Sequence, residues 1–193
     1  MKKKLLYTVL LIGVAIAGVT IFFTIQSNQG KIIEIDDKSN PLSITYIING
    51  SEVRLKDGYA EEAIPNSASK ILTVYFGNDL VADLNGDGLE DIVFFITQQT
   101  GGTGTFYYVV AAVNSEDGYI GSNAYFIGDR IAPQTIEEIG GGVIEVNYAE
   151  RAEDEPMTAQ PSISKSIFLK LNENNEWFPV ESYRSHPAGR EEE

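Results

Sequence analysis

The chain reads Ile71-Leu72-Thr73-Val74-Tyr75-Phe76, then Asp83-Leu84-Asn85-Gly86-Asp87-Gly88-Leu89-Glu90-Asp91, then Ile92-Val93-Phe94-Phe95-Ile96. The first and last of these segments are rich in β-branched and aromatic residues, which favour strands. The middle segment is acidic and contains two glycines, so it cannot continue either strand. We therefore predict that a nine-residue loop joins two β-strands.

The loop carries oxygen-bearing side chains at its positions 1, 3, 5 and 9. A hard cation such as Ca²⁺ takes six to eight oxygen ligands at about 2.3–2.6 Å. Gly88, at position 6, allows a backbone reversal that residues with a Cβ resist, and the carbonyl of Leu89 can add a main-chain oxygen. The loop is therefore predicted to bind calcium. The side chains that would face the ion are those of Asp83, Asn85, Asp87 and Asp91.

An EF-hand is not the right description of this site, because that motif needs two flanking helices and a Glu at position 12, where this chain has Phe94. The loop instead resembles the calcium loop of FG-GAP repeats, the blades of integrin-type β-propellers. Their pattern, Asp-x-Asn-x-Asp-Gly-x-x-Asp followed by an apolar strand, is met at every acidic or amide position. The resemblance implies five ligands: the side chains of Asp83, Asn85, Asp87 and Asp91, and the carbonyl of Leu89.

This resemblance covers only about residues 80–96 and occurs once. A propeller needs several blades at a period of roughly 40–50 residues, so the resemblance concerns the loop and not the whole fold. Residues 101–108 and 127–131 are also similar to stretches of exported bacterial proteins, a similarity that implies no function. The alternative for the loop is a simple acidic β-turn, because Asn-Gly and Asp-Gly are common hairpin signals. Its carboxylates would repel one another without a cation, which favours the calcium site.

The N-terminus predicts a membrane anchor. Three lysines precede 21 uncharged residues, 5–25, and at a 1.5 Å rise per residue such a helix spans roughly the 30 Å of a bilayer core. A cleaved signal peptide has a shorter apolar core of about 7–15 residues. Cleavage after the small-x-small segment Ala15-Ile16-Ala17 would leave a strongly apolar new terminus. We therefore predict a single-pass protein of the cell membrane, with its lysines in the cytoplasm and its C-terminal part extracytoplasmic.

The charge and the lack of cysteine exclude several functions. The residues after position 30 include 11 basic and 28 acidic side chains, a formal charge of −17. Such a surface repels phosphate backbones, so nucleic acid is not expected as a partner. The absence of cysteine excludes disulfides and thiolate catalysis.

Calcium loops of extracellular modules bind with dissociation constants of about 10⁻⁴–10⁻³ M, which suits a structural ion.

The remaining pattern predicts a single all-β domain, an antiparallel sandwich or barrel-like fold, over residues 31–183. Residues 1–30 form the anchor and a spacer, and the acidic tail 184–193 is predicted to be disordered. A helical turn is expected only at 59–63. Asn49-Gly50 predicts a hairpin turn, and 106–113 is apolar enough for burial on both faces. The expected strands are 44–48, 52–55, 71–76, 92–97, 106–113, 124–127, 136–139, 143–148, 163–171 and 177–180.

Other candidate sites are weaker. The glycine-rich segment 101–105 lacks the helix and the Lys of a phosphate loop, so it is interpreted as a hairpin tip that could lie beside the calcium loop. His186, the only histidine, is in the tail and could act as a base only if the tail folded back. Asp129-Arg130 could pair with a carboxylate of the calcium loop or with a neighbouring strand.

Two groups of residues support alternative functions. The acidic pairs 61–62, 137–138 and 153–155 could supply the two carboxylates of a glycosidase, although they are more simply surface clusters. A set of aromatic residues could stack on sugar rings or could pack in the core: Tyr107, Tyr108, Tyr119, Tyr125, Tyr148 and Trp177.

The sequence thus favours a membrane-anchored, extracytoplasmic calcium-binding β module. We expect a non-enzymatic binding or structural role in the cell envelope, with a surface protein or a carbohydrate as the partner. The alternative is a hydrolase of cell-wall or other polysaccharide.

Overall fold

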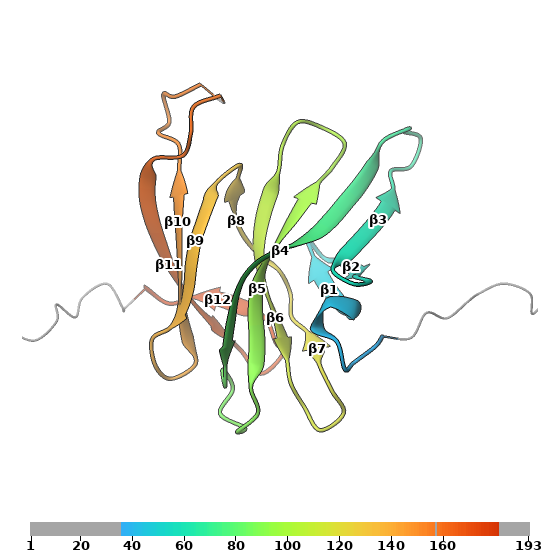
Figure 1. Ribbon diagram of the computed structural model, residues 1–193, viewed down its shortest axis with the longest axis vertical. Coiled ribbons are helices and arrows are strands. Elements are labelled where there is room, and N and C mark those ends of the chain that lie inside the picture. The colour runs from blue at the N-terminus through green and yellow to red at the C-terminus, as the bar shows by residue number, and fades with distance from the viewer. Residues whose placement is uncertain (1–35, 157, 182–193) are drawn as a thin grey trace, which may run out of the picture. The chain divides into compact units, whose positions relative to one another are not determined.

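The computed structural model describes residues 36–156 and 158–181, and these form twelve strands and one short 3₁₀ helix (Figure 1). The 3₁₀ helix η1 is Pro41–Ser43. The strands are β1 (Thr45–Ile48), β2 (Ser51–Arg54), β3 (Tyr59–Ala63), β4 (Lys70–Ala82), β5 (Asp91–Gln99), β6 (Phe106–Val113), β7 (Ile120–Gly121), β8 (Tyr125–Asp129), β9 (Ala132–Glu138), β10 (Val143–Glu150), β11 (Ile163–Leu171) and β12 (Trp177–Pro179). The predicted all-β class is confirmed.

A central sheet contains β3, β4, β5 and β6 in that order, and every pairing within it is antiparallel. Both β7 and β8 pair with β6, each along a different half of that strand. Consecutive residues of a strand point to opposite faces, and here both faces of β5 and β6 are covered. Val93 and Phe95 pack on one side of β5, and Phe94 and Ile96 pack on the other. The two-sided burial predicted for 106–113 is therefore confirmed.

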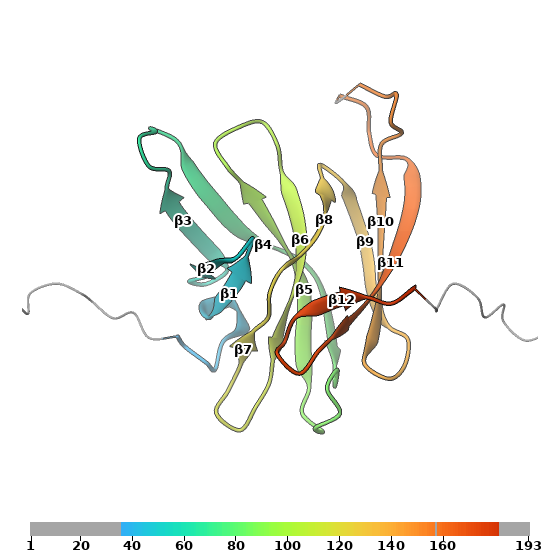
Figure 2. The ribbon, with the colours of Figure 1, turned by 180° about the vertical axis from the view of Figure 1, so that it is seen from behind.

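The first core lies between the central sheet and a second antiparallel sheet of order β12-β11-β10-β9. Val109 of β6, Ile144 of β10 and Leu169 of β11 are completely buried in it. Hydrogen bonds link the sheets at their sides, and two of them involve asparagine side chains. The Asn78 side chain of β4 donates to the carbonyl of Gln134 in β9 at 2.6 Å. On the other side the main-chain N–H of Trp177 donates to Oδ1 of Asn123 at 2.7 Å, and Figure 2 shows β12 reaching from β11 toward this segment.

The second core lies on the opposite face of β5 and β6, under the hairpin of β1 and β2. Tyr46 and Val53 of this hairpin are almost fully buried against Phe94 and Val110 of the central sheet. Asn49 and Gly50 have φ values of 51° and 78°, as a type I′ turn requires. The hairpin predicted at this position is therefore confirmed.

One local prediction was wrong. Residues 59–63, expected as a helical turn, form the edge strand β3, which pairs with β4 from Tyr59 opposite Val74 to Ala63 opposite Lys70. Ala and Glu favour helices, but the five residues are too few to nucleate one. The unpaired edge of β4 offers them ladder hydrogen bonds instead. The two-residue strand β7 was not predicted because it is too short to show a sequence pattern.

The path of β5 corrects a second expectation. The candidate calcium loop precedes Asp91 at the start of β5, and residues 100–105, which include the glycine-rich segment 101–105, follow Gln99 at its end. Nine residues at about 3.4 Å each separate the two loops, and Figure 1 shows them at opposite ends of the sheet. The glycine-rich segment is a hairpin tip between β5 and β6, as predicted, but it does not lie beside the candidate calcium loop.

The predicted anchor and spacer, His186 and the acidic tail lie outside the described residues. Within residues 36–156 and 158–181 the structure has no helix with the length and apolar character needed to span a bilayer.

Candidate metal centre

The candidate calcium loop connects two paired strands. Ala82, the last residue of β4, is directly opposite Asp91, the first residue of β5. Residues 83–90 therefore protrude from the end of a two-stranded ladder, and all except Leu84 are exposed. Leu84 is buried in the first core and fixes the beginning of the loop to the body of the domain. The strand–loop–strand arrangement agrees with the sequence prediction.

The loop side chains turn inward and accept hydrogen bonds from the loop backbone. The two carboxylate oxygens of Asp83 accept from the main-chain N–H groups of Gly86 at 2.7 Å and Gly88 at 2.9 Å. Oδ1 of Asn85 accepts from Asp87 at 2.9 Å, and Oδ1 of Asp87 accepts from Leu89 at 2.8 Å. The Asn85 amide also donates to Oδ2 of Asp87 at 3.0 Å, so the side chains of positions 1, 3 and 5 are all held by hydrogen bonds within one curled segment.

Two glycines permit this curl. Gly86 and Gly88 have φ values of 82° and 86°, and their Cβ positions would meet no other atom within 4 Å. The backbone conformation, and not lack of space, accounts for glycine at both positions. The interpretation of Gly88 as the residue that allows the reversal is supported by this geometry.

Asp91, the last residue of the motif, holds the loop to neighbouring main-chain groups. Its side chain is completely buried, and its two oxygens accept hydrogen bonds from the main-chain N–H groups of Leu84 at 3.0 Å and Asn114 at 2.8 Å. Burial raises the pKa of Asp91 above its ordinary value, the two N–H groups lower it, and the negative charges of Asp87 and Asp83 raise it again. Asp83 and Asp87 are thus close enough for their charges to act on Asp91.

The structure brings the predicted ligands together only in part. Asp83, Asn85 and Asp87 share the curled segment, and Asp91 lies at its base. Among residues 36–156 and 158–181, no group of three or more Asp, Glu, His or Cys side chains is gathered tightly enough to hold a metal ion. The other two predicted ligands, the Asn85 amide and the Leu89 carbonyl, are not among these four side-chain types. The loop geometry is also that of an acidic turn stabilised by its own hydrogen bonds.

Two residues near the loop were not found by sequence reasoning. Asn114, directly after β6, donates to Asp91 through its backbone and to the carbonyl of Glu90 through its side chain at 3.2 Å. No sequence signal distinguishes it from any other residue after a strand. Gly142, in the turn between β9 and β10, packs so closely against Leu84 that a Cβ would lie 2.1 Å from the Leu84 carbonyl oxygen. The run of three glycines at 140–142 was the available signal.

A cavity of about 420 Å³ lies beside the loop, between the β9–β10 turn and the β11–β12 turn. Its charged lining residues are Asp83, Glu138, Glu173 and Lys170. Glu138 already accepts a hydrogen bond from the main-chain N–H of Gly140 at 2.9 Å. Three residues with carboxylates and one with an ammonium group therefore line a cavity next to the candidate metal site.

The other candidate residues have structural partners. Arg130 pairs with its neighbour Asp129 at 2.6 Å between Nη2 and Oδ2, and Oδ1 of Asp129 also accepts from the main-chain N–H of Thr105 at 3.0 Å. The Arg130 guanidinium holds the pKa of Asp129 below its usual value. The pair therefore fixes the glycine-rich hairpin tip to the turn after β8, at the end of β5 opposite the candidate calcium loop.

The acidic pairs do not form carboxylate dyads on the strands. Glu61 and Glu62 are consecutive in β3, as are Glu137 and Glu138 in β9, so the members of each pair point to opposite faces. Glu61 accepts hydrogen bonds from Lys70 and Tyr59 on the surface. The aromatic residues considered for sugar stacking are divided between the two cores, with Trp177 and Tyr107 in the first and Tyr108 and Tyr119 in the second. They do not form one stacking face.

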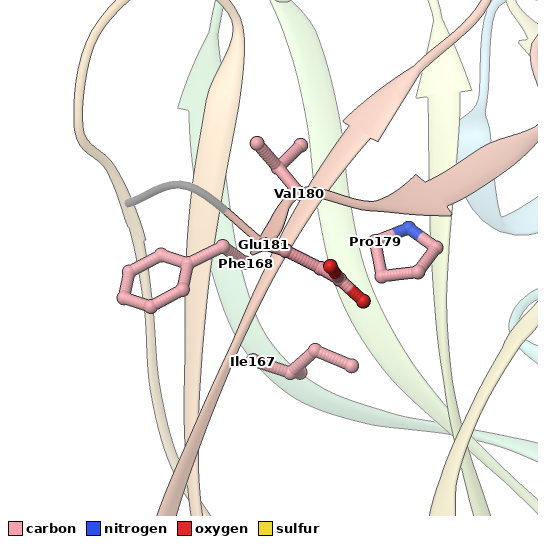
Figure 3. Close-up of a pocket in the computed structure, with 5 residues that line it drawn as sticks. All are labelled: Ile167, Phe168, Pro179, Val180 and Glu181. Carbon is pink, nitrogen blue, oxygen red and sulfur yellow. The ribbon is translucent and has the colours of Figure 1, made fainter. Parts of the chain in front are cut away.

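A second cavity, of about 400 Å³, lies where β11 and β12 meet (Figure 3). Its described lining is Ile167, Phe168, Pro179, Val180 and Glu181, and Figure 3 shows the Glu181 carboxylate between Pro179 and Ile167. One carboxylate in a mainly apolar lining does not provide the acid and base of a glycosidase.

The geometry defines an antiparallel all-β protein with an acidic loop at one end of its central sheet. Comparisons of the chain with family models, with curated proteins and with solved structures found no match.

Proposed function

We propose that this chain is a membrane-anchored, extracytoplasmic calcium-binding β module that works by binding and not by catalysis. In this proposal one sandwich-like domain follows an N-terminal transmembrane helix. The side chains of Asp83, Asn85, Asp87 and Asp91 and the carbonyl of Leu89 hold the ion. The role is structural or adhesive and belongs to the cell envelope.

The observation that carries the proposal is the environment of Asp91. A completely buried carboxylate is costly to ionise, and this one also experiences the negative charges of Asp83 and Asp87. A divalent cation between these groups would turn their mutual repulsion into attraction. The donor set suits Ca²⁺, because every proposed ligand atom is a hard oxygen.

The hydrogen bonds inside the loop are compatible with this role. Each carboxylate oxygen of Asp83 accepts one main-chain N–H, and a carboxylate offers about four lone-pair sites in all. One site on each oxygen is therefore left for a cation. Bound calcium would hold the loop closed and would fix the ends of β4 and β5 where Ala82 pairs with Asp91.

Thermal unfolding of the full chain in detergent tests the proposal. With a dissociation constant of about 10⁻⁴ M, 10 mM Ca²⁺ stabilises the fold by roughly 2.7 kcal/mol, which corresponds to a rise in Tm of about 5–10 °C. Asp87→Ala should abolish this rise, whereas the matched control Asp154→Ala, in the exposed turn after β10, should keep it. Equal Tm values with and without Ca²⁺, at matched ionic strength, would disprove calcium binding.

One observation favours the alternative of a polysaccharide hydrolase. The cavity beside the loop has Asp83, Glu138 and Glu173 in its lining, and glycosidases use two carboxylates across such a space. The general acid of that mechanism needs a raised pKa. Asp91 has one, but its buried carboxylate does not line the cavity. Hydrolysis of a cell-wall polysaccharide that is lost in Glu138→Gln would replace our proposal with this one.

A further inference from the structure

We propose that a pocket on the outer face of the central sheet binds a neutral saccharide. The pocket has a volume of about 470 Å³, within the range of about 300–1,000 Å³ that is typical of small-molecule sites. It is lined by Asn49, Gln98, Thr100, Phe106, Tyr108 and Phe126. This inference goes beyond calcium binding and does not depend on it.

The pocket exists because the β1–β2 hairpin covers the central sheet only in part. Phe94, Ile96 and Val110 lie under the hairpin in the second core. The hairpin ends at its turn, where the Asn49 side chain donates to the hydroxyl oxygen of Tyr108 at 2.9 Å. Past this turn the pocket lies beside residues of the same sheet, namely Gln98, Phe106, Tyr108 and Phe126.

Aromatic rings form the wall of the pocket. Phe126 is directly opposite Tyr108 in the β6–β8 pairing, and their ring centroids are 5.4 Å apart. Phe106 lies 6.3 Å from Phe126. The side chain of Phe126 is 50% exposed, although a Phe on a strand normally packs inward. An exposed ring beside a hollow provides the flat apolar surface on which the C–H face of a pyranose can stack.

Polar groups that can make further hydrogen bonds line the same space. Gln98 is only 6% exposed, and its amide nitrogen donates to Thr73 at 3.3 Å. Within the described residues its amide oxygen accepts no hydrogen bond. The Tyr108 hydroxyl accepts from Asn49 and still has its own proton to donate. A ligand with hydroxyl groups at the correct positions can therefore donate to the Gln98 amide oxygen and accept from the Tyr108 hydroxyl.

The ligand should be uncharged. None of the six lining residues has a charge, although the chain as a whole has a formal charge of −14. Amide, phenol and hydroxyl groups provide donors and acceptors for sugar hydroxyls, whereas a carboxylate on the ligand would find no cation in the lining. A purely apolar ligand would give no hydrogen-bond partner to the Gln98 amide oxygen or to the Tyr108 hydroxyl proton. Its affinity should therefore be much lower than that of a ligand with hydroxyl groups. A neutral sugar ring satisfies both the aromatic wall and the polar groups.

Saturation-transfer NMR on the full chain tests the inference, in a detergent without a sugar head group. The probes are cellobiose and N,N′-diacetylchitobiose as neutral sugars and glucuronic acid as the charged control. We expect saturation of the ring protons of at least one neutral probe and at least about tenfold weaker binding of glucuronic acid. Removal of Ca²⁺ should leave sugar binding unchanged, because the pocket and the calcium loop are at opposite ends of β5.

Variants identify the binding site. Phe126→Ala should weaken binding of the neutral probe at least about tenfold. The matched control Phe178→Ala removes a comparably exposed ring from β12, in the other sheet, and should have no effect. Asn49→Gly, which keeps the turn, and Gln98→Leu should both weaken binding, and their Tm values report whether they are folded. No saturation of either neutral sugar, or equal binding by Phe126→Ala and the native chain, would overturn the inference.

Discussion

Gly142 lies against the main chain of Leu84 so closely that a Cβ at this position would be 2.1 Å from the Leu84 carbonyl oxygen. The contact joins the turn between β9 and β10, in the second sheet, to the beginning of the candidate calcium loop, in the central sheet. Gly142 also has a φ of 72°, in the left-handed region. The position of the loop relative to the second sheet therefore depends on the absence of a side chain at one residue.

Gly142→Ala should destabilise the protein more than Gly141→Ala. Both residues have positive φ, and alanine in that conformation costs about 1–2 kcal/mol. At Gly141 a Cβ would meet nothing within 4 Å, so no further cost is expected. At Gly142 the collision with the Leu84 backbone adds roughly 1–3 kcal/mol. Denaturant unfolding of both variants measures the difference, and equal free energies of unfolding would refute the importance of this contact.

The strands of the central sheet could be predicted because their sequence pattern and their environment agree. The apolar runs in β5 and β6 reflect burial on both faces, and Asn49-Gly50 has the positive φ values that its hairpin turn requires. Residues 59–63 could not be predicted in the same way. Their local preference is helical, and pairing with the edge of the next strand, β4, decides their conformation instead.

The candidate site was predictable as a motif but not in its surroundings. The spacing from Asp83 to Asp91 identifies a loop with inward-facing oxygens, because alternate residues of a curled chain share one side. The support of Asp91 by Asn114, 23 residues later, depends on the pairing of β5 with β6. The local sequence around either residue does not predict such a contact. The pocket proposed to bind a saccharide was missed for the same reason, since its residues come from four separate segments.

Asp129→Asn should reduce stability at neutral pH and should have less effect in acid. Arg130 holds the pKa of Asp129 below its ordinary value, so the carboxylate stabilises the fold when it is ionised. This contribution is complete above about pH 4 and is lost as the pH falls through the lower pKa of the folded state. Because the pair is partly exposed, we expect a loss below about 1 kcal/mol at pH 7.

Chemical denaturation at pH 7 and at several values below pH 4 measures this effect. The difference between the native chain and Asp129→Asn should decrease as the pH falls. Asp154→Asn, in the turn after β10, serves as the control and should differ little from the native chain throughout. A difference for Asp129→Asn that grows in acid would show that the ion pair is not its source.

Trp177→Phe should cost much less stability than the size of the side chain suggests. Trp177 packs in the first core at 5% exposure, and its indole N–H has no hydrogen-bond partner among the described residues. Removal of an unsatisfied buried donor recovers about 1–3 kcal/mol, which offsets the smaller volume of Phe. Trp177→Ala, which leaves a cavity, should lose about 3–5 kcal/mol. Circular dichroism during denaturation measures both, and comparable losses would contradict this account.

The N-terminal segment should remain on the mature protein and hold it in the membrane. Residues 5–25 contain no charge and are long enough for a bilayer-spanning helix, so the protein should resist extraction from membranes by alkaline carbonate. Because three lysines precede this segment, protease added outside intact cells should degrade the domain that follows it. Intact-mass measurement of the detergent-extracted protein gives the decisive result. Loss of the first 17 or more residues would show a cleaved signal peptide and would remove the anchor from the proposed function.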